Sequence, residues 1–216
     1  MKKYIAAEIL GTFIIVFIGT GAIIINEVTG GNVTHLGVCF LWGFAVALAI
    51  VSAGRLAESH FNPAVTIALI IAGKFSAKKS FEHISAQITG ALLASIVLYL
   101  FFPTNTTLGT TLPNVEPWMA AVIEIIISFV LMASIAITEM MNVKSRFLAA
   151  LMIGFAVFIA AFFAGPLTGA SMNPARSIGP ALISGHTEYL LLYLIAPIAG
   201  MLLAVPLYKL KRSDSN

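Results

Sequence analysis

WGFAVALAIVSAGRLAESHFNPA occupies residues 42–64 of the chain, and IGFAVFIAAFFAGPLTGASMNPA occupies residues 153–175. At an offset of 111 residues the two stretches are identical at 11 of 23 positions without a gap. Both end in Asn-Pro-Ala, at 62–64 and at 173–175. A single triplet of this kind is a common turn or helix cap, but two copies in register indicate an internal repeat.

The amino-acid composition indicates the solvent in which this repeat folds. Hydrophobic residues make up 59% of the 216 residues and charged residues only 10%, whereas a soluble domain carries about 25% charged residues. The chain is therefore predicted to be an all-α membrane protein without a soluble domain. Its six apolar runs, each close to the length that crosses a bilayer, lie at about 4–25, 36–53, 82–102, 118–139, 147–164 and 188–208.

The first apolar run follows Met1-Lys2-Lys3 and continues to about Ile25. It is too long for the apolar region of a signal peptide and has no convincing polar region before its end, so we expect it to be retained as the first span. The only cysteine, Cys39, allows no internal disulfide and is expected to be a packing residue. We find no nucleotide-binding loop, metal-ligand cluster or nucleophile–base pair, and predict neither an enzyme nor a cofactor.

The basic residues indicate how the spans are oriented. With six spans, every Lys and Arg except Arg176 falls on one side: Lys2, Lys3, Arg55, Lys74, Lys78, Lys79, Lys144, Arg146, Lys209, Lys211 and Arg212. The positive-inside rule makes that side the cytoplasm and places both termini there. Since these residues flank spans, the net charge of +3 predicts membrane orientation and not binding of nucleic acid. The lone external Arg176 requires a separate explanation.

Each repeat unit holds three spans, so the second unit is expected to lie upside down relative to the first. We expect one membrane domain over 1–216, with units at about 4–102 and 118–208. The segments that follow the triplets, 65–72 and 177–183, are apolar but too short to span, which favours re-entrant half-helices that meet at the membrane centre. Asn is a preferred N-cap and Pro a preferred first helical residue. Each half-helix would then point the positive end of its dipole at the centre.

HFNPAVT at 60–66 and TGASMNPARSIGP at 168–180, with Glu8 and Glu124 upstream, resemble the aquaporin or major intrinsic protein family. AGPLTGASMNPARS and Tyr193-Leu194 are most similar to the nodulin-26-like branch and its bacterial relatives. The resemblance covers essentially the whole chain. It implies six transmembrane helices plus two half-helices in an inverted three-plus-three arrangement. It also implies a homotetramer in the plasma (inner) membrane, whose partners are the lipid bilayer, water and small neutral solutes.

The resemblance implies two control points in a narrow pore. The first is the pair Asn62 and Asn173, in triplets completed by Pro63, Ala64, Pro174 and Ala175, which would turn a passing oxygen and oppose proton hopping. The second is an outer constriction formed by Trp42, Ala161, Ala170 and Arg176, which gives the external arginine a role as a donor. Carbonyl groups of Ser59, His60, Gly169, Ala170 and Ser171 would line the approaches.

The residues that bear on selectivity favour different permeants, some glycerol and some water. Water-selective members of the family carry His where this chain has Ala161, so the aperture is expected to be wider, and an apolar Trp42 wall facing Arg176 suits glycerol. Glycerol facilitators, however, carry Asp where this chain has Ser177, and Ala181 resembles water channels. The hypothesis is a passive pore for water, glycerol, urea, or undissociated boric or arsenous acid that excludes protons and ions.

One departure from the family pattern and several other polar residues leave alternatives open. Glu58 stands where the family commonly has Gly, so it could strain the inner loop or pair with Arg55. Glu8 and Glu124 lie within spans and are either proton sites of a coupled transporter or acceptors for backbone N–H groups of the re-entrant segments. His35, His83 and His186 lie at span ends, where an interfacial position is expected.

Three other functions compete with a permissive channel. A secondary transporter is also built from inverted repeats and broken helices, but it would need coupling-ion ligands at the membrane centre. A strictly water-selective aquaporin would share every motif quoted above. A junctional or structural membrane protein would conduct little. Flux measurements distinguish these functions, because only the transporter gives saturable, ion-dependent uptake.

Overall fold

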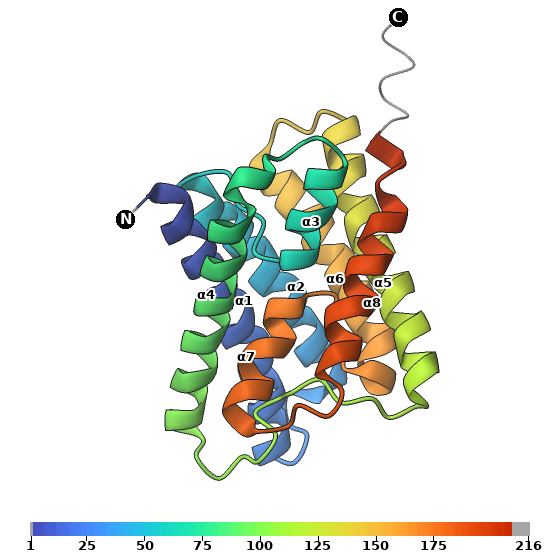
Figure 1. Cartoon of the computed structure of the whole chain (residues 1–216). Helices are drawn as coiled ribbons and strands as arrows, with labels where there is room; N and C mark the ends of the chain where they lie inside the picture. Colours follow the sequence, from blue (N-terminus) through green and yellow to red (C-terminus); the bar gives the residue numbers. More distant parts are fainter. Residues whose placement is uncertain (1, 209–216) are drawn as a thin grey trace, which may run out of the picture.

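The computed structural model describes residues 2–208, which form eight α-helices and two short 3₁₀ turns (Figure 1). The basic tail residues Lys209, Lys211 and Arg212 lie outside the described residues. The helices are α1 (Lys3–Val28), α2 (Thr34–Val51), α3 (Pro63–Ile71), α4 (Ser80–Phe101), α5 (Pro117–Met140), α6 (Arg146–Thr168), α7 (Pro174–Ser184) and α8 (Leu190–Ala204). The two half-helices predicted after the Asn-Pro-Ala triplets are α3 and α7.

Five of the helices, α1, α2, α4, α5 and α6, are long and apolar enough to cross a membrane. The sixth predicted span, expected over 188–208, forms the 15-residue helix α8 in the described part of the chain. Pro206 explains where α8 ends, because it has no N–H to offer the carbonyl of Leu202. The Val205 and Tyr208 amides instead bond to carbonyls three residues earlier, each at 3.1 Å.

The two half-helices interlock the halves of the chain. α3 packs on α8 and α7 packs on α4, so each half-helix lies against the last helix of the other half. Figure 1 shows α3 above α7, with the starts of the two helices facing each other in the middle of the bundle. The first residues of α1 and the end of α8 lie at the α3 end of the bundle.

The halves approach each other closely at the two glycines of the repeated GFAV sequence, Gly43 in α2 and Gly154 in α6. A Cβ on Gly43 would lie 2.6 Å from the carbonyl oxygen of Gly154, and a Cβ on Gly154 would lie 2.6 Å from that of Gly43. Such distances are far below van der Waals contact, so only glycine fits at both positions. Small residues of this kind let membrane helices pack backbone against backbone.

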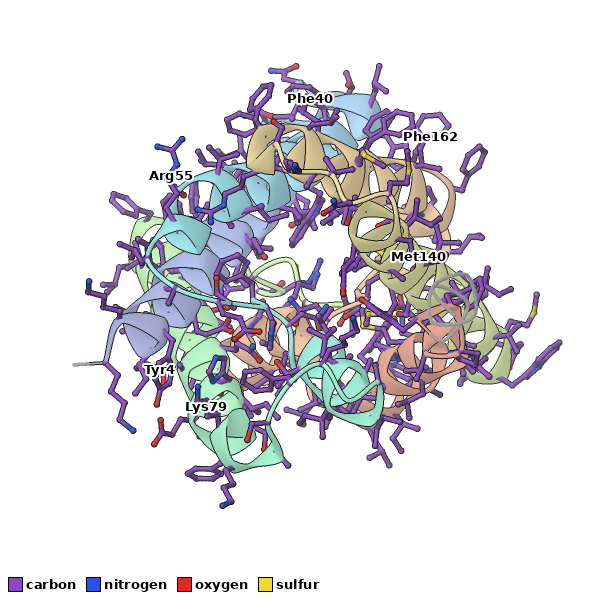
Figure 2. All side chains as sticks on the ribbon, turned by 90° about the horizontal axis from the view of Figure 1, so that it is seen from above. Tyr4, Phe40, Arg55, Lys79, Met140 and Phe162 are labelled. Carbon is purple, nitrogen blue, oxygen red and sulfur yellow. The ribbon has the colours of Figure 1, made fainter. Side chains whose placement is uncertain are left out.

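The outside of the bundle is apolar. Figure 2 shows the helices as a ring seen from above, with the labelled Phe40 of α2 and Phe162 of α6 on the outer side. These side chains are 60% and 39% exposed. An apolar surface of this extent is unsuited to water but matches lipid chains, in agreement with the composition.

Candidate pore

The two half-helices begin in the same way. Asn62 and Asn173 have extended backbones, and their side-chain oxygens accept hydrogen bonds from the N–H groups of Ala64 (2.9 Å) and Ala175 (3.0 Å). The proline after each asparagine occupies the first helical position, where its missing N–H leaves no bond unmade. Asn-Pro-Ala therefore starts a helix at each site, and the two starts meet inside the protein.

The two asparagines also tie the half-helices to each other. Asn62 Nδ2 donates to the carbonyl of Met172 at 2.8 Å, and Asn173 Nδ2 donates to the carbonyl of Phe61 at 2.9 Å. Phe61 and Met172 hold positive φ angles of 58° and 53°, which few non-glycine residues adopt. Since each amide nitrogen carries two hydrogens, one donor on each asparagine is left for another acceptor.

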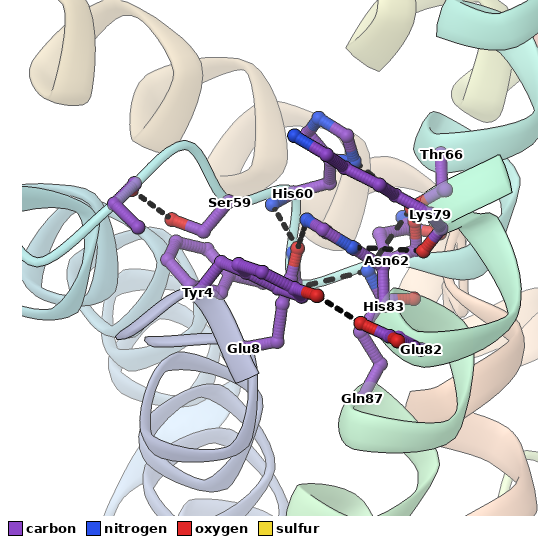
Figure 3. Close-up of polar contacts among 12 residues, drawn as sticks. Tyr4, Glu8, Ser59, His60, Asn62, Thr66, Lys79, Glu82, His83 and Gln87 are labelled. Atoms are coloured by element: carbon purple, nitrogen blue, oxygen red, sulfur yellow. Dashed lines mark hydrogen bonds and ion pairs between the residues drawn. The ribbon is translucent and has the colours of Figure 1, made fainter. Parts of the chain in front are cut away.

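The buried Glu8 and Glu124 hold the segments that lead to the asparagines. Glu8 accepts the N–H groups of His60 and Phe61, both at 2.7 Å (Figure 3). Glu124 accepts the N–H groups of Ser171 and Met172 at 2.9 and 3.0 Å. Both carboxylates are fully buried. Of the two interpretations of these residues, this geometry is the one that a structural acceptor requires.

A second layer of polar contacts supports the segment that leads to Asn62. Gln87 Nε2 donates to Glu8 Oε2 at 3.1 Å and to Thr66 Oγ1 at 3.0 Å, and the same Thr66 oxygen lies 3.0 Å from His60 Nδ1 (Figure 3). Gln87 was not identified from the sequence. A buried amide within an apolar span is a recognisable signal of such a role, because polar groups at membrane depth need partners.

Arg176 is the largest fully buried side chain in the described part of the chain. Its Nη1 donates to the carbonyl of Gly109 at 2.9 Å, whereas Nε and Nη2 have no protein partner. Its Cζ lies 4.7 Å from the ring centroid of Trp42. The Trp42 ring and the Arg176 guanidinium thus face each other at contact distance, which leaves no room for a solute between them.

A cavity of about 540 Å³ connects these features. It is lined by all four residues predicted for the constriction, Trp42, Ala161, Ala170 and Arg176, and by Ser59, His60, Asn62, Ser171 and Asn173. Most of its remaining lining is apolar, from residues such as Val46, Val65, Leu131 and Ile135. Within this lining, Trp42 and Arg176 lie against each other, and Ala161 and Ala170 contribute small side chains.

Comparison with known proteins decides the family. The family model described as "Major intrinsic protein" matches residues 1–208. The chain belongs to the major intrinsic protein family. It is 38% identical over 216 residues to aquaporin NIP1-2 of Oryza sativa subsp. japonica, covering 96% of this chain and 71% of that protein. It is 39% identical over 209 residues to aquaporin NIP1-1 of Zea mays, covering 96% and 74%.

The fold agrees with this assignment. The X-ray structure of the aquaglyceroporin from Plasmodium falciparum matches with a TM-score of 0.88 and 26% identity, over 95% of this chain and 94% of that one. The predicted fold class and the resemblance to nodulin-26-like channels are thus confirmed. As a member of the major intrinsic protein family the chain is a multi-pass integral membrane channel and not an enzyme.

Two residues of this major intrinsic protein lie elsewhere than expected. Gly169 was expected to line the outer approach, but it closes α6 with a φ of 77° and packs on Thr111, away from the described cavity lining. The helix α6 continues to Thr168, so Gly169 serves as its C-cap. His83 was expected at the interface but is 1% exposed, stacked on Tyr4 and 3.9 Å from Glu8.

The mouth of the cavity at the α3 end of the bundle carries charges. Lys74 Nζ lies 2.5 Å from Glu139 and over the ring of Tyr208, and these residues line the cavity with Glu58. Glu58 shows no positive φ and, within residues 2–208, makes no ion pair with Arg55. The strain expected from a side chain at this position is therefore not present in the inner loop.

Proposed function

We propose that this major intrinsic protein is a passive channel for water and small uncharged solutes, of which glycerol and urea are the leading candidates, and that it excludes ions and protons. Undissociated boric and arsenous acids share the required size and neutrality. One observation carries the proposal: Asn62, Asn173 and Arg176, each with an unpaired donor, line a single cavity whose walls are otherwise mainly apolar.

The chemistry of these donors favours neutral oxygen-bearing solutes. A hydroxyl or carbonyl oxygen can accept from the asparagine amides and the guanidinium while its carbon atoms contact the apolar wall. The N-terminal ends of α3 and α7 add positive potential at the centre, and Arg176 adds a full charge, so cations are repelled. A water molecule that accepts from both asparagines is turned, which interrupts a hydrogen-bonded chain for proton hopping.

A strictly water-selective pore is the second candidate, and one contact favours it. The stacking of Trp42 on Arg176 at 4.7 Å narrows the constriction from one side. The secondary-transporter alternative has less support, because Glu8 and Glu124 bind backbone N–H groups and neither lies in the described lining of the cavity.

The proposal includes an orientation and an assembly. Both termini and the α3 end of the bundle are placed in the cytoplasm, because the basic residues other than Arg176 fall on that side of the predicted topology. The homotetramer and the plasma (inner) membrane follow from the family resemblance.

Stopped-flow light scattering on proteoliposomes tests the function. Sucrose, glycerol and urea gradients in turn report water flux and the flux of each solute, and a trapped pH dye reports proton leak. The proposal expects water flux and solute flux above those of empty liposomes. It expects no proton leak, and solute flux that neither saturates nor depends on an ion. Water flux without any solute flux would favour the water-selective candidate, and ion-dependent uptake would favour a transporter.

A further inference from the structure

Three buried hydroxyl groups form a continuous chain beside the outer half of the cavity. Thr111 Oγ1 donates to Ser177 Oγ at 2.8 Å, and Ser177 Oγ lies 2.7 Å from Ser171 Oγ. Ser171 Oγ donates to the carbonyl of Asn173 at 3.1 Å. Thr111, Ser177 and Ser171 are 3%, 0% and 4% exposed, so the three hydroxyl groups depend mainly on one another for hydrogen bonds.

The carbonyl acceptor at the end of this series of hydroxyl groups fixes which hydroxyl donates to which. A carbonyl oxygen cannot donate, so Ser171 must give its only hydroxyl hydrogen to Asn173. Ser177 must then donate to Ser171, and Thr111 to Ser177. Ser171 Oγ also accepts the N–H of Asn173 at 3.3 Å. Every hydroxyl hydrogen has an acceptor in this arrangement, which leaves the Ser171 side chain one orientation although it lines the cavity.

The inner half of the protein contains the equivalent contact. His60 and Thr66 correspond to Ser171 and Ser177 at the repeat offset of 111 residues, and their side chains also meet, at 3.0 Å. The third partner differs between the halves. In the inner half it is Gln87, which belongs to α4. In the outer half it is Thr111, which belongs to the segment between the two halves.

This connecting segment, residues 102–116, is itself fixed at several points. Its Gly109 carbonyl accepts from Arg176, and Thr110 Oγ1 lies 3.0 Å from Ser184 Oγ of α7. The Asn114 backbone N–H donates to the Leu167 carbonyl at 2.9 Å. Thr111 is therefore held in place relative to both α6 and α7.

We infer that Thr111 and Ser177 are positioning residues that set how well neutral solutes pass relative to water. The inference rests on the proposed channel function. A solute that fills the pore needs Arg176 and the Ser171–Asn173 segment in fixed relative positions at the same moment, whereas single water molecules adapt to small displacements. Without the Thr111–Ser177 bond, α7 is no longer tied at Ser177 to the connecting segment whose Gly109 carbonyl holds Arg176. Loss of this bond is therefore expected to reduce solute flux more than water flux.

Thr111→Val removes the first donor with little change of shape, and Ser177→Ala removes the middle link. In proteoliposomes of the full chain, each is expected to lower the ratio of glycerol to water permeability by about two- to ten-fold, the factor that corresponds to one neutral hydrogen bond. Thr111→Ser keeps the donor and is expected to restore the ratio. Ser184→Ala is the matched control. It removes a hydroxyl that contacts the same connecting segment but is not one of the three hydrogen-bonded hydroxyls of Thr111, Ser177 and Ser171.

The ratio of glycerol to water permeability distinguishes a positioning role from a loss of folded protein. Loss of folded protein lowers glycerol flux and water flux by the same factor and leaves the ratio unchanged. If Thr111→Val and Ser177→Ala leave the ratio at the wild-type value, or if Thr111→Ser changes it as much as Thr111→Val, the inference is overturned. Should one variant fail to fold, the other carries the same test. Failure of the proposed function is distinguishable, because the wild-type protein would then show no glycerol flux above empty liposomes.

Discussion

Replacement of Ala161 by histidine tests the proposed constriction most directly. Ala161 lines the cavity together with Trp42 and Arg176, which are in contact with each other, and it is 5% exposed. An imidazole ring in place of a methyl group therefore grows into the remaining aperture. It also adds a hydrogen-bonding group to the cavity wall, which a water molecule can use.

The size of the effect follows from the cost of forcing a group into filled space. Overpacking costs about 1–3 kcal/mol, which corresponds to a reduction of about 5- to 150-fold in the passage of a solute that must squeeze past the ring. Water is small enough to pass beside the ring, so we expect water permeability to stay within about two-fold of the wild type, well below the solute effect.

The assay is stopped-flow light scattering on proteoliposomes with matched protein content, under sucrose and glycerol gradients. Ala161→Val is the matched control for bulk, since it narrows the aperture without adding a donor or acceptor. The expected order of glycerol permeability is wild type, then Ala161→Val, then Ala161→His. Unchanged glycerol permeability in Ala161→His, or an equal fall in water and glycerol, would refute the assignment of Ala161 to the constriction.

Three further predictions concern stability, measured by thermal unfolding in detergent. Gly154→Val drives a side chain into the backbone of α2 and should destabilise the protein by about 1–3 kcal/mol; an unchanged unfolding temperature would contradict the close helix contact. Tyr193→Phe removes the 2.6 Å bond to the Thr168 carbonyl and should cost about 1 kcal/mol, so an equally stable variant would count against that bond. Lys74→Met should change stability by less than about 1 kcal/mol, because the pair with Glu139 is exposed; a larger loss would show that this pair does more than a surface ion pair.

Much of the architecture could be predicted from the sequence because it depends on local patterns. Long apolar runs gave five of the spans, and Asn62-Pro63 and Asn173-Pro174 gave the starts of both half-helices, since capping is decided within a few residues. The end of α8 was predicted less well, because Pro206 interrupts an apolar run that the composition alone extends to residue 208.

The candidate site was predictable only where the repeat or a family motif marked it. Gln87 and Thr111 carry no motif, and their partners lie 79 and 66 residues away in the chain. His83 was expected at the interface because it lies near a helix start, but the packing of α1 against α4 buries it beside Glu8. Contacts of this kind depend on how whole helices dock, which no local pattern specifies.

The sequence by itself determined that the chain folds in a membrane, that it repeats, and that each repeat contains a capped half-helix. These properties follow from composition and from hydrogen bonds between near neighbours. Only the tertiary structure decided that the two asparagines bond across the repeat, that Trp42 rests on Arg176, and that the segment between the halves reaches Ser177. The reason is physical: these contacts exist only once the two inverted halves have closed on each other.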